Sequence, residues 1–272
     1  MAGAAFDRAA VLDAAAALRG AGPVVVLFAD AGAAYLIDNW LAHARAAGVA
    51  RVLLLALDGA VAARPAVPGC TVVPLAFAGD LGALWLRRLD VFVLLAAAGI
   101  DFMHSDLDAV WLADARAECF ADPTLDLVFS QGTFLPAQAH AAWGFVLCCG
   151  LFAVRAGPAA AGFLAAVRAR AAALRDDQVA VNLLLAESGA AWTREAGEAP
   201  YRIAVHGRHF TCHRQLLRGA GAGVTVGLLP FHRVPRLATE GPALVKHPWA
   251  PRDPAARIAA LRRSGVWREP AR

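Results

Sequence analysis

Short apolar runs alternate with amphipathic stretches along the first half of the chain. Residues 23–30, PVVVLFAD, form an apolar run that predicts a buried strand. In residues 33–48 the apolar side chains recur with helical spacing and Gly48 follows the last of them, which predicts a helix ending at that glycine. The same alternation continues beyond this point. Further strands are expected at residues 51–59, 71–75 and 100–108, and a further helix at residues 82–99.

Three of these predicted strands run out at an aspartate. Asp30, Asp58 and Asp106 each follow an apolar run. In α/β proteins with parallel sheets, ligands bind beyond the carboxyl ends of the strands. We therefore predict an α/β fold in which these three carboxylates lie beside a ligand.

The second half of the chain is less regular. Its apolar runs predict strands at residues 125–130 and 144–156, and then two helices at residues 158–175 and 176–189. Helices are also expected at the two ends, over residues 1–22 and over the arginine-rich residues 252–272. With no repeat and no linker, we expect one domain over residues 1–272. Stretches rich in proline and glycine indicate loops at residues 206–215, 227–236 and 244–254.

The composition bears on where in the cell the protein is expected and on whether it crosses a membrane. Of the 272 residues 59% are hydrophobic, but much of that share is alanine, so the mean hydropathy of +0.51 overstates how apolar the chain is. The longest apolar run, residues 91–100, is too short to cross a bilayer. Because the sequence lacks a signal pattern at its start, we expect a cytoplasmic protein, with a trimmed catalytic domain of the secretory pathway as the alternative.

Charge and cysteine content exclude some classes of partner. The net charge is +4, almost all of the cations are arginine, and Lys246 is the only lysine. A mild basic excess suits phosphate-bearing ligands, but the chain has no long basic run of the kind that binds nucleic acid. The five cysteines are an odd number without metal-ligand spacing, which favours a reducing compartment.

The most informative segment is HSDLDAVWL, residues 104–112, in which Asp106 and Asp108 follow an apolar run. Two carboxylates one residue apart can both reach a divalent cation if the strand breaks into a turn, and oxygen ligands suit Mg²⁺ or Mn²⁺. Two aspartates one residue apart also occur without a metal, as residues that form turns or cap helices. Two chemistries use such a pair. One is a metal that bridges the diphosphate of a nucleotide sugar; the other is a haloacid dehalogenase-type phosphatase, in which the first aspartate is the nucleophile and the second a general acid.

Five segments occur in the order found in a known family. They resemble the nucleotide-diphospho-sugar transferase family that includes plant cell-wall xylosyl- and arabinosyltransferases, over about Val24 to Trp267. The resemblance implies a glycosyltransferase A-type fold, which is a Rossmann-like mixed sheet flanked by helices, with a UDP-sugar donor, a divalent metal and retention of anomeric configuration. The segments are residues 38–58, 104–112, 148–156, 176–182 and 247–267.

The resemblance also implies roles for single residues in metal and nucleoside binding. Asp106 and Asp108 match the family's metal-binding pair, and His247 matches a late histidine that completes the site, with Mn²⁺ or Mg²⁺ as the ion. Asp58 matches the acid that closes the second strand near the nucleoside. The sequence departs from the family pattern at Cys148, where the family often has the asparagine of Asn-x-Gly. A thiol cannot supply the hydrogen-bond donor and acceptor pair of an amide.

Further matches lie on the phosphate and sugar side. Arg88 falls where the family usually has lysine, and Lys246 beside the late histidine is expected to reach the diphosphate. Asp177, Gln178 and Asn182 match a D-Q-x-x-x-N pattern. We assign Asp177 and Gln178 to the catalytic centre, as supports for the sugar. The residues assigned to the donor are Asp30, Asp58, Arg88, Asp106 and Lys246.

Several other polar and aromatic residues are expected to be structural. Trp111 is expected in the core, and Trp143 is not assigned to the sugar. The arginines of the tail are expected on a solvated helix face, with docking to an anionic acceptor or a membrane surface as the alternative. These are Arg252, Arg257, Arg262, Arg263 and Arg268.

Together these observations predict a metal-dependent glycosyltransferase that moves a sugar from a UDP-sugar to the hydroxyl of an unknown acceptor, with retention. Retention is expected because no residue stands out as a general base on the acceptor side. Two alternatives remain open. One is the phosphatase that uses Asp106 and Asp108, and the other is a nucleotide-sugar-binding protein without catalysis. Neither a nucleic-acid partner nor a transmembrane segment is expected.

Overall fold

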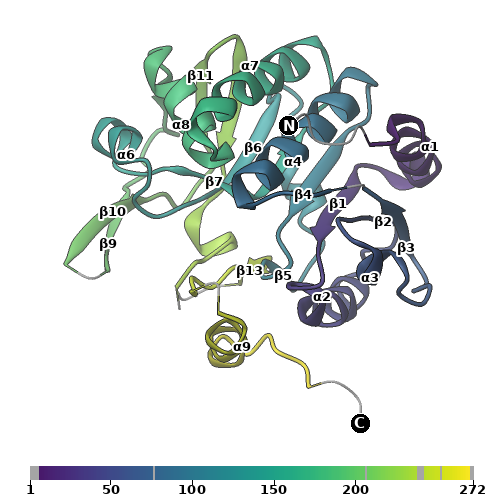
Figure 1. Cartoon of the computed structure of the whole chain (residues 1–272). Coiled ribbons are helices and arrows are strands. Elements are labelled where there is room, and N and C mark those ends of the chain that lie inside the picture. The colour runs from purple at the N-terminus through teal and green to yellow at the C-terminus, as the bar shows by residue number, and fades with distance from the viewer. Residues whose placement is uncertain (1–5, 76, 206, 238–241, 252, 270–272) are drawn as a thin grey trace.

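The computed structural model of the chain describes residues 6–75, 77–205, 207–237, 242–251 and 253–269. Across these residues the main sheet has nine strands in the order β3-β2-β1-β4-β7-β6-β12-β11-β8 (Figure 1). The strands are β1 (Val24–Ala29), β2 (Val52–Ala56), β3 (Cys70–Pro74), β4 (Phe102–Ser105), β6 (Leu127–Gln131), β7 (Leu147–Val154), β8 (Ala191–Thr193), β11 (Leu217–Gly221) and β12 (Val224–Leu228).

The sheet is parallel on one side and mixed on the other. β3, β2, β1 and β4 run parallel to one another. β7 lies antiparallel between β4 and β6, and β12 runs parallel to β6. The parallel strands are joined through α2 (Ala34–Ala46), α3 (Gly59–Ala62) and α4 (Leu81–Ala97). The carboxyl ends of β1, β2 and β4 therefore meet at one end of the sheet, as the aspartates at the ends of the predicted strands require.

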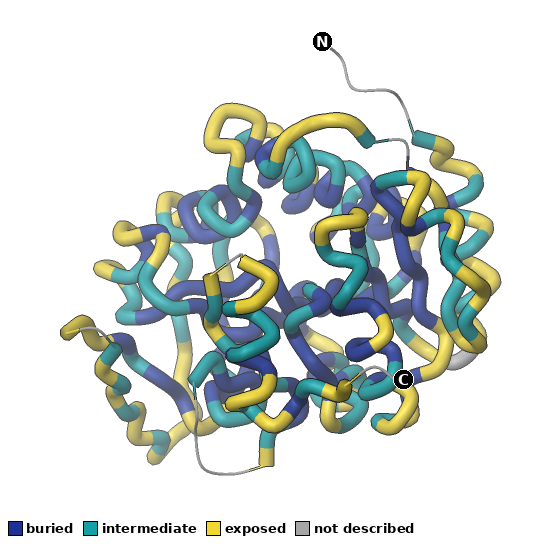
Figure 2. The backbone as a smooth tube through the Cα atoms, turned by 60° about the horizontal axis from the view of Figure 1, so that its bottom comes forward, coloured by how far each residue is buried: buried dark blue, intermediate teal, exposed yellow. Residues whose placement is uncertain are grey.

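Helices cover both faces of the sheet (Figure 1). One face is covered by α1 (Arg8–Leu18), α4, α7 (Pro158–Leu174) and α8 (Asp177–Glu187), and these pack with the sheet into one apolar core. The second core, on the other face, joins the sheet to α2, α3, the short strands β5 (Val110–Trp111) and β13 (Val245–Lys246), and α9 (Pro254–Arg263). Figure 2 shows the buried strands between exposed outer segments. The expected Rossmann-like mixed sheet flanked by helices is confirmed.

Aspartates and prolines set where the helices begin. Asp80 caps α4 by accepting a 3.0 Å hydrogen bond from the Ala83 amide, and Asp176 caps α8 by accepting one of 2.8 Å from the Val179 amide. A capping carboxylate of this kind satisfies one of the amides that a helix leaves unpaired at its start. α7 begins at Pro158, whose missing N–H costs nothing in the first turn. Local chemistry therefore sets the starts of these three helices.

The late part of the chain holds more strand than its sequence suggests. Residues 206–215, expected as a loop, contain β10 (Arg208–Cys212), which pairs antiparallel with β9 (Tyr201–Val205). This expectation was wrong because Phe210 and Cys212 are buried against Phe231 in a small apolar cluster of their own. The loop expected at 227–236 begins inside β12, and the one at 244–254 contains β13.

Both terminal helices are shorter than expected. α1 spans Arg8–Leu18 and is followed by a 3-10 turn over Arg19–Ala21, while α9 spans Pro254–Arg263. Residues 1–5, Arg252 and residues 270–272 lie outside the described residues, so the outer parts of both predictions fall there. α5 (Arg116–Cys119) and α6 (Ala137–Trp143) complete the described helices. Within the described chain, every helix is too short or too polar to span a bilayer.

Candidate functional site

The two aspartates of the D-x-D segment lie on a turn directly after β4. The Asp106 amide donates a 2.7 Å hydrogen bond to the Gly150 carbonyl on β7, and the Ala109 amide donates one of 3.0 Å to the Asp106 carbonyl. The first bond extends the β4–β7 ladder by one residue, and the second closes the turn. The strand thus breaks at Asp106, as a shared site for both carboxylates requires.

Two buried indoles stabilise the turn through hydrogen bonds. Trp40 Nε1 donates a 2.9 Å hydrogen bond to the Ala109 carbonyl, and Trp111 Nε1 donates one of 3.1 Å to Ser105 Oγ. Both indoles are fully buried, and their rings meet edge to face with centroids 5.9 Å apart. The interpretation of Trp111 as a core residue is confirmed. Its role at the site is to fix the backbone that carries the carboxylates.

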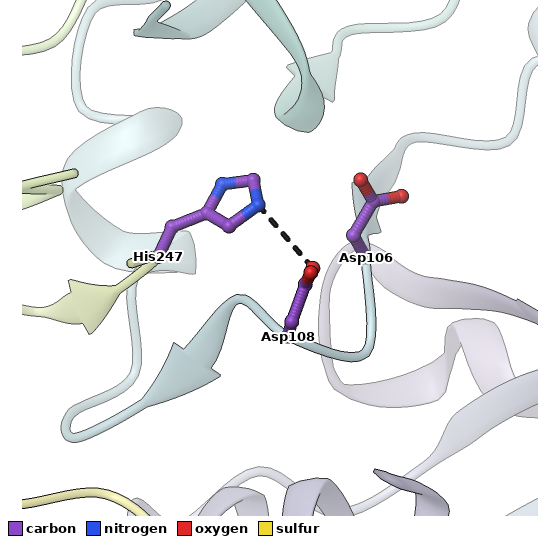
Figure 3. A group of neighbouring side chains, drawn as sticks. All are labelled: Asp106, Asp108 and His247. Carbon is purple, nitrogen blue, oxygen red and sulfur yellow. Dashed lines mark ion pairs between the residues drawn. The ribbon is translucent and has the colours of Figure 1, made fainter. Parts of the chain in front are cut away.

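A two-residue ladder brings His247 to the aspartates. β13 pairs antiparallel with β5, with Val245 opposite Trp111 and Lys246 opposite Val110. The next residue, His247, is buried, and its Nε2 lies 3.3 Å from Asp108 Oδ1 (Figure 3). The register of β13 on β5 thus explains how a late histidine reaches the D-x-D turn.

Asp106, Asp108 and His247 form a group that can hold one metal ion. One ligand atom from each lies within 4.8 Å of the others. Gly150 keeps the space between them open: a Cβ atom there would lie 2.6 Å from Asp106 Oδ2 and 2.5 Å from His247 Cε1. Two carboxylates and one imidazole suit Mn²⁺ or Mg²⁺. The residues present therefore fit a divalent ion.

Arg88 on α4 links this group to α8. Its buried guanidinium lies with Nη1 3.2 Å from Asp106 Oδ1 and with Nη2 3.3 Å from Asp177 Oδ2, and Nη2 donates a 2.8 Å hydrogen bond to the Cys149 carbonyl. Burial alone raises the pKa of Asp106, but Arg88 outweighs it and holds that pKa well below its ordinary range. Because Arg88 engages Oδ1, Oδ2 is left beside the open space at Gly150.

His104 supports the same carboxylate from inside the sheet. It is buried, its Nδ1 lies 3.0 Å from the Val26 carbonyl oxygen and its Nε2 lies 3.2 Å from Asp106 Oδ1, and the neutral ring carries one N–H to donate to one of these two acceptors. Burial and the nearby Arg88 charge lower its pKa to about 4. His104 is therefore neutral at pH 7, and Arg88 is the cation that balances Asp106.

In the D-Q-x-x-x-N segment, Asp177 and Gln178 lie beside the site, whereas Asn182 has a structural role. Asp177 is buried against Arg88, and burial, with the repulsion of Asp176 and Asp106, raises its pKa to about 6. Gln178 accepts a hydrogen bond from the Cys149 amide at 3.3 Å. Asn182 instead brackets β7, accepting from the Leu147 amide at 2.8 Å and donating to the Leu147 carbonyl at 2.9 Å. Its amide is thus occupied by the backbone.

A cleft of about 290 Å³ opens at the carboxyl ends of β1 and β4. Asp30, Arg88, Asp106 and Asp108 all line it. Asp58 braces the loop after β1, because its Oδ2 accepts a 2.6 Å hydrogen bond from the Ala31 amide. The remaining walls are largely apolar and include Phe28, Leu36, Leu57, Leu84 and Trp85. Two of the three strand-end aspartates, Asp30 and Asp106, therefore line the cleft, and the third, Asp58, supports the loop that carries Asp30.

Lys246 and Arg257 lie where the sequence did not suggest. Lys246 Nζ donates a 2.7 Å hydrogen bond to the Ser264 carbonyl, and its side chain lines a different cavity. Arg257 on α9 lines the cleft, with Nε 3.1 Å from Asp108 Oδ2 and its side chain 21% exposed. The expectation of a solvated face was wrong for Arg257. No motif marks this arginine, and only the packing of α9 shows its place.

A thiol and a second arginine surround His247. Arg236 Nη1 lies 3.2 Å from Cys148 Sγ and 3.1 Å from His247 Nδ1. Burial and Arg236 act to lower the pKa of His247, but hydrogen bonding to Asp108 and Cys148 raises it to about 9. Burial raises the pKa of Cys148, whereas Arg236 and His247 together lower it to about 7. Trp143 is elsewhere, in an aromatic cluster with Trp192 and Phe145.

Comparison with known proteins identifies the family. The model of the family described as nucleotide-diphospho-sugar transferase matches residues 79–242, more than half of the 272 residues. The chain belongs to the nucleotide-diphospho-sugar transferase family. The matched region of this transferase includes Arg88, Asp106, Asp108 and Asp177, while His247 and Arg257 follow it. A search of curated proteins found no match.

Solved glycosyltransferases resemble parts of this transferase. One is GlyE of Streptococcus pneumoniae, at 13% identity and a TM-score of 0.41, over 60% of this chain and 43% of that chain. The second is the galactosyltransferase LgtC, solved with donor and acceptor sugar analogues, at 12% identity and a TM-score of 0.43, over 59% of this chain and 69% of that chain. Mouse xyloside xylosyltransferase 1 follows at 13% identity and a TM-score of 0.32, over 59% and 74%.

We predict that His247 titrates near pH 9 in the metal-free protein. Its folded pKa lies above the ordinary value of 6.5, so the fold favours the protonated ring. The resulting stability is fully present below pH 6.5 and is lost as the pH rises through about 9. Proton NMR of the imidazole Cε1–H resonances measures the titration. Asp108→Asn should lower the pKa, whereas Asp114→Asn, the same change away from the site, should leave it unaltered. A wild-type titration at or below pH 6.5 would contradict the assignment.

Proposed function

We propose that this transferase moves a sugar from a UDP-sugar to an acceptor hydroxyl and depends on a divalent metal. The observation that carries the proposal is the grouping of Asp106, Asp108 and His247 around the space at Gly150, at the edge of a cleft. Membership of the family supports a nucleotide-diphosphate sugar as the donor. The choice of UDP and of Mn²⁺, or Mg²⁺, belongs to the proposal.

Each part of the donor has a place in the cleft. The nucleoside lies beside Asp30 and the apolar wall that follows β1 and β2, near Asp58 at the end of β2. Asp106, Asp108 and His247 would hold the ion, which would supply Lewis-acid stabilisation of the departing nucleoside diphosphate. The sugar lies towards Arg88, Asp177 and Gln178, where α8 meets β7. Asp177 and Gln178 support the sugar and orient its anomeric carbon.

Arg257 is the cation best placed for the diphosphate. It lines the cleft beside Asp108, whereas Lys246 donates to the Ser264 carbonyl and lines a different cavity. An arginine presents several donors in a fixed plane that matches phosphate oxygens. We assign the diphosphate contact to Arg257. The contact that the sequence predicts for Lys246 stays a prediction, because Lys246 lines a different cavity.

The phosphatase alternative fits the geometry less well. Its general acid, Asp108, must carry a proton to donate one. Burial raises the pKa of Asp108, but the hydrogen bond and charge of His247 outweigh it and lower the pKa below its ordinary value. The carboxylate is therefore ionised at neutral pH. An ionised pair facing an imidazole favours metal binding over acid catalysis.

The extent and location of the enzyme complete the proposal. Site residues come from Asp30 near the start of the sheet to Arg257 in α9, which supports a single catalytic domain over residues 1–272. We propose that this domain works in the cytoplasm.

We predict that UDP binding requires the metal and the D-x-D pair. In calorimetry, Mn²⁺ should enable UDP to bind to the wild type, and the double variant Asp106→Asn, Asp108→Asn should abolish the metal-dependent part because neutral amides replace both carboxylate ligands. Circular dichroism checks that the variant is folded, and Asp114→Asn serves as the control. Unchanged metal-dependent affinity in the double variant would sink the proposal. Tight UDP binding without turnover on any acceptor would instead indicate the non-catalytic binder.

We predict that Arg257→Gln weakens binding of UDP with Mn²⁺ by about tenfold, since hydrogen bonds to charged groups contribute about 1.5–3 kcal/mol. Arg262→Gln is the matched control: it makes the same change on the same helix, and Arg262 pairs with Glu269 at 2.6 Å. Calorimetry measures both variants at one ionic strength. Equal losses in the two would mean that α9 contributes only long-range charge.

We predict retention of anomeric configuration. Inversion needs a free base on the acceptor side of the sugar. Asp177, the carboxylate that we propose beside the sugar, faces the guanidinium of Arg88 and is therefore not free. In a retaining reaction the departing phosphate oxygen can take the acceptor's proton, so no dedicated base is needed. Proton NMR of fresh product gives the anomeric coupling. A β-linked product from an α-linked donor would show inversion and make Asp177 the candidate base.

A further inference from the structure

A second and larger cavity adjoins the metal-binding group. Its volume is about 690 Å³, and its walls come from the segment after β12, from β13 and from α9. Arg236 joins the two places: its side chain lines the cavity, and its Nη1 contacts the ring of His247 at 3.1 Å. A molecule in this cavity would therefore lie one side chain away from the proposed metal.

The cavity carries three cations and none of its described lining residues is acidic. Arg236, Lys246 and Arg263 all line it. Lys246 Nζ donates to the Ser264 carbonyl, a contact that does not neutralise its charge. In Arg236, Nε is buried and lacks a hydrogen-bond partner among the described residues. Three like charges gathered around one space repel one another unless an anion joins them.

Arginines close in sequence to those of the cavity are paired with acids. Arg233 pairs with Glu118, Arg257 with Asp108 and Arg262 with Glu269. In the described part of the chain, by contrast, no ion pair joins Arg236, Lys246 or Arg263 to an acidic side chain. These three arginines are thus paired with acidic side chains, whereas the three cations that line the cavity are not.

Exposed apolar side chains complete the walls. Trp249 is 54% exposed and Leu112 is 40% exposed, and both line the cavity. They are two of the four large hydrophobic residues that are exposed in the described chain. An indole at the wall of a polar cavity offers an apolar face to a sugar ring, while cations nearby meet an acidic group.

We propose that this cavity binds the acceptor through a sugar unit that carries a negative charge, a carboxylate or a phosphate. The proposal names the acceptor class for the transferase and so depends on the proposed function. The acidic group lies among Arg236, Lys246 and Arg263, and the sugar ring lies against Trp249. Arg236 then connects the bound acceptor to His247.

The test compares glucuronate and glucose 6-phosphate with neutral glucose, each titrated calorimetrically into the full-length protein with and without UDP and Mn²⁺. Both anionic sugars should bind at low salt and glucose should bind at least tenfold more weakly. Arg263→Gln should weaken the anionic sugars by about tenfold, because it removes one charged hydrogen-bond donor. Arg262→Gln makes the same change in net charge one residue away and should have no effect. Binding of UDP with Mn²⁺ should be the same in both variants.

Four results would overturn the inference. They are no binding of either anionic sugar, equal binding of glucose, equal losses in the two variants, and displacement of the anionic sugars by UDP, which would place them in the donor cleft. The wild type could instead bind vesicles that contain anionic lipid, lose this binding in Arg263→Gln, and bind neither soluble anionic sugar. That result would mean that the cavity binds a lipid surface and not a sugar. Because UDP binding is measured separately, failure of the donor site and failure of the acceptor cavity are distinguishable.

Discussion

The buried guanidinium of Arg88 is the interaction on which the site depends. Asp106 lies on the turn after β4 and Asp177 begins α8, and burial acts to raise the pKa of both carboxylates. Arg88 lies between them, at 3.2 and 3.3 Å, with its charge stacked on the Trp85 ring 4.6 Å away. Removing one partner of a buried ion pair costs about 3–5 kcal/mol. Arg88 is therefore first of all the residue that lets two acids lie close together.

The two acids differ in how far Arg88 compensates their burial. Asp106 is ionised well below pH 7, whereas the pKa of Asp177 is about 6, and both face the same cation. Asp177 is nearly inaccessible and is repelled by Asp176 at its side, while Asp106 lies at the edge of the cleft. One guanidinium thus keeps Asp106 ionised at the cleft while the pKa of the deeper Asp177 stays at about 6.

The sequence predicted the parts of the site that follow from local pattern. Asp30, Asp58 and Asp106 end apolar runs, and parallel topology brings such ends together, so their position at one end of the sheet followed from the apolar pattern and that topology. His247 needed the family resemblance, because its place depends on the short β5–β13 ladder. The sequence named Arg257 and Arg263 among the tail arginines but could not single them out, since an arginine on an amphipathic helix has the same pattern whether it faces water or a cleft. β9 and β10 were missed because their buried positions serve a separate small cluster.

Asp108 shows how the metal-free site stays stable with so many charges. Its two oxygens are divided between His247, at 3.3 Å, and Arg257, at 3.1 Å. In the proposed function Asp106, Asp108 and His247 would hold a divalent ion, whose charge would take the place of the charge that these two cations now supply. His247 would bind that ion only as a neutral ring, and Arg257 would then be available to the diphosphate. Arg236, beside His247, would then have one less positive neighbour. In the proposed function, the protonation of this one imidazole would couple the donor side to the acceptor side.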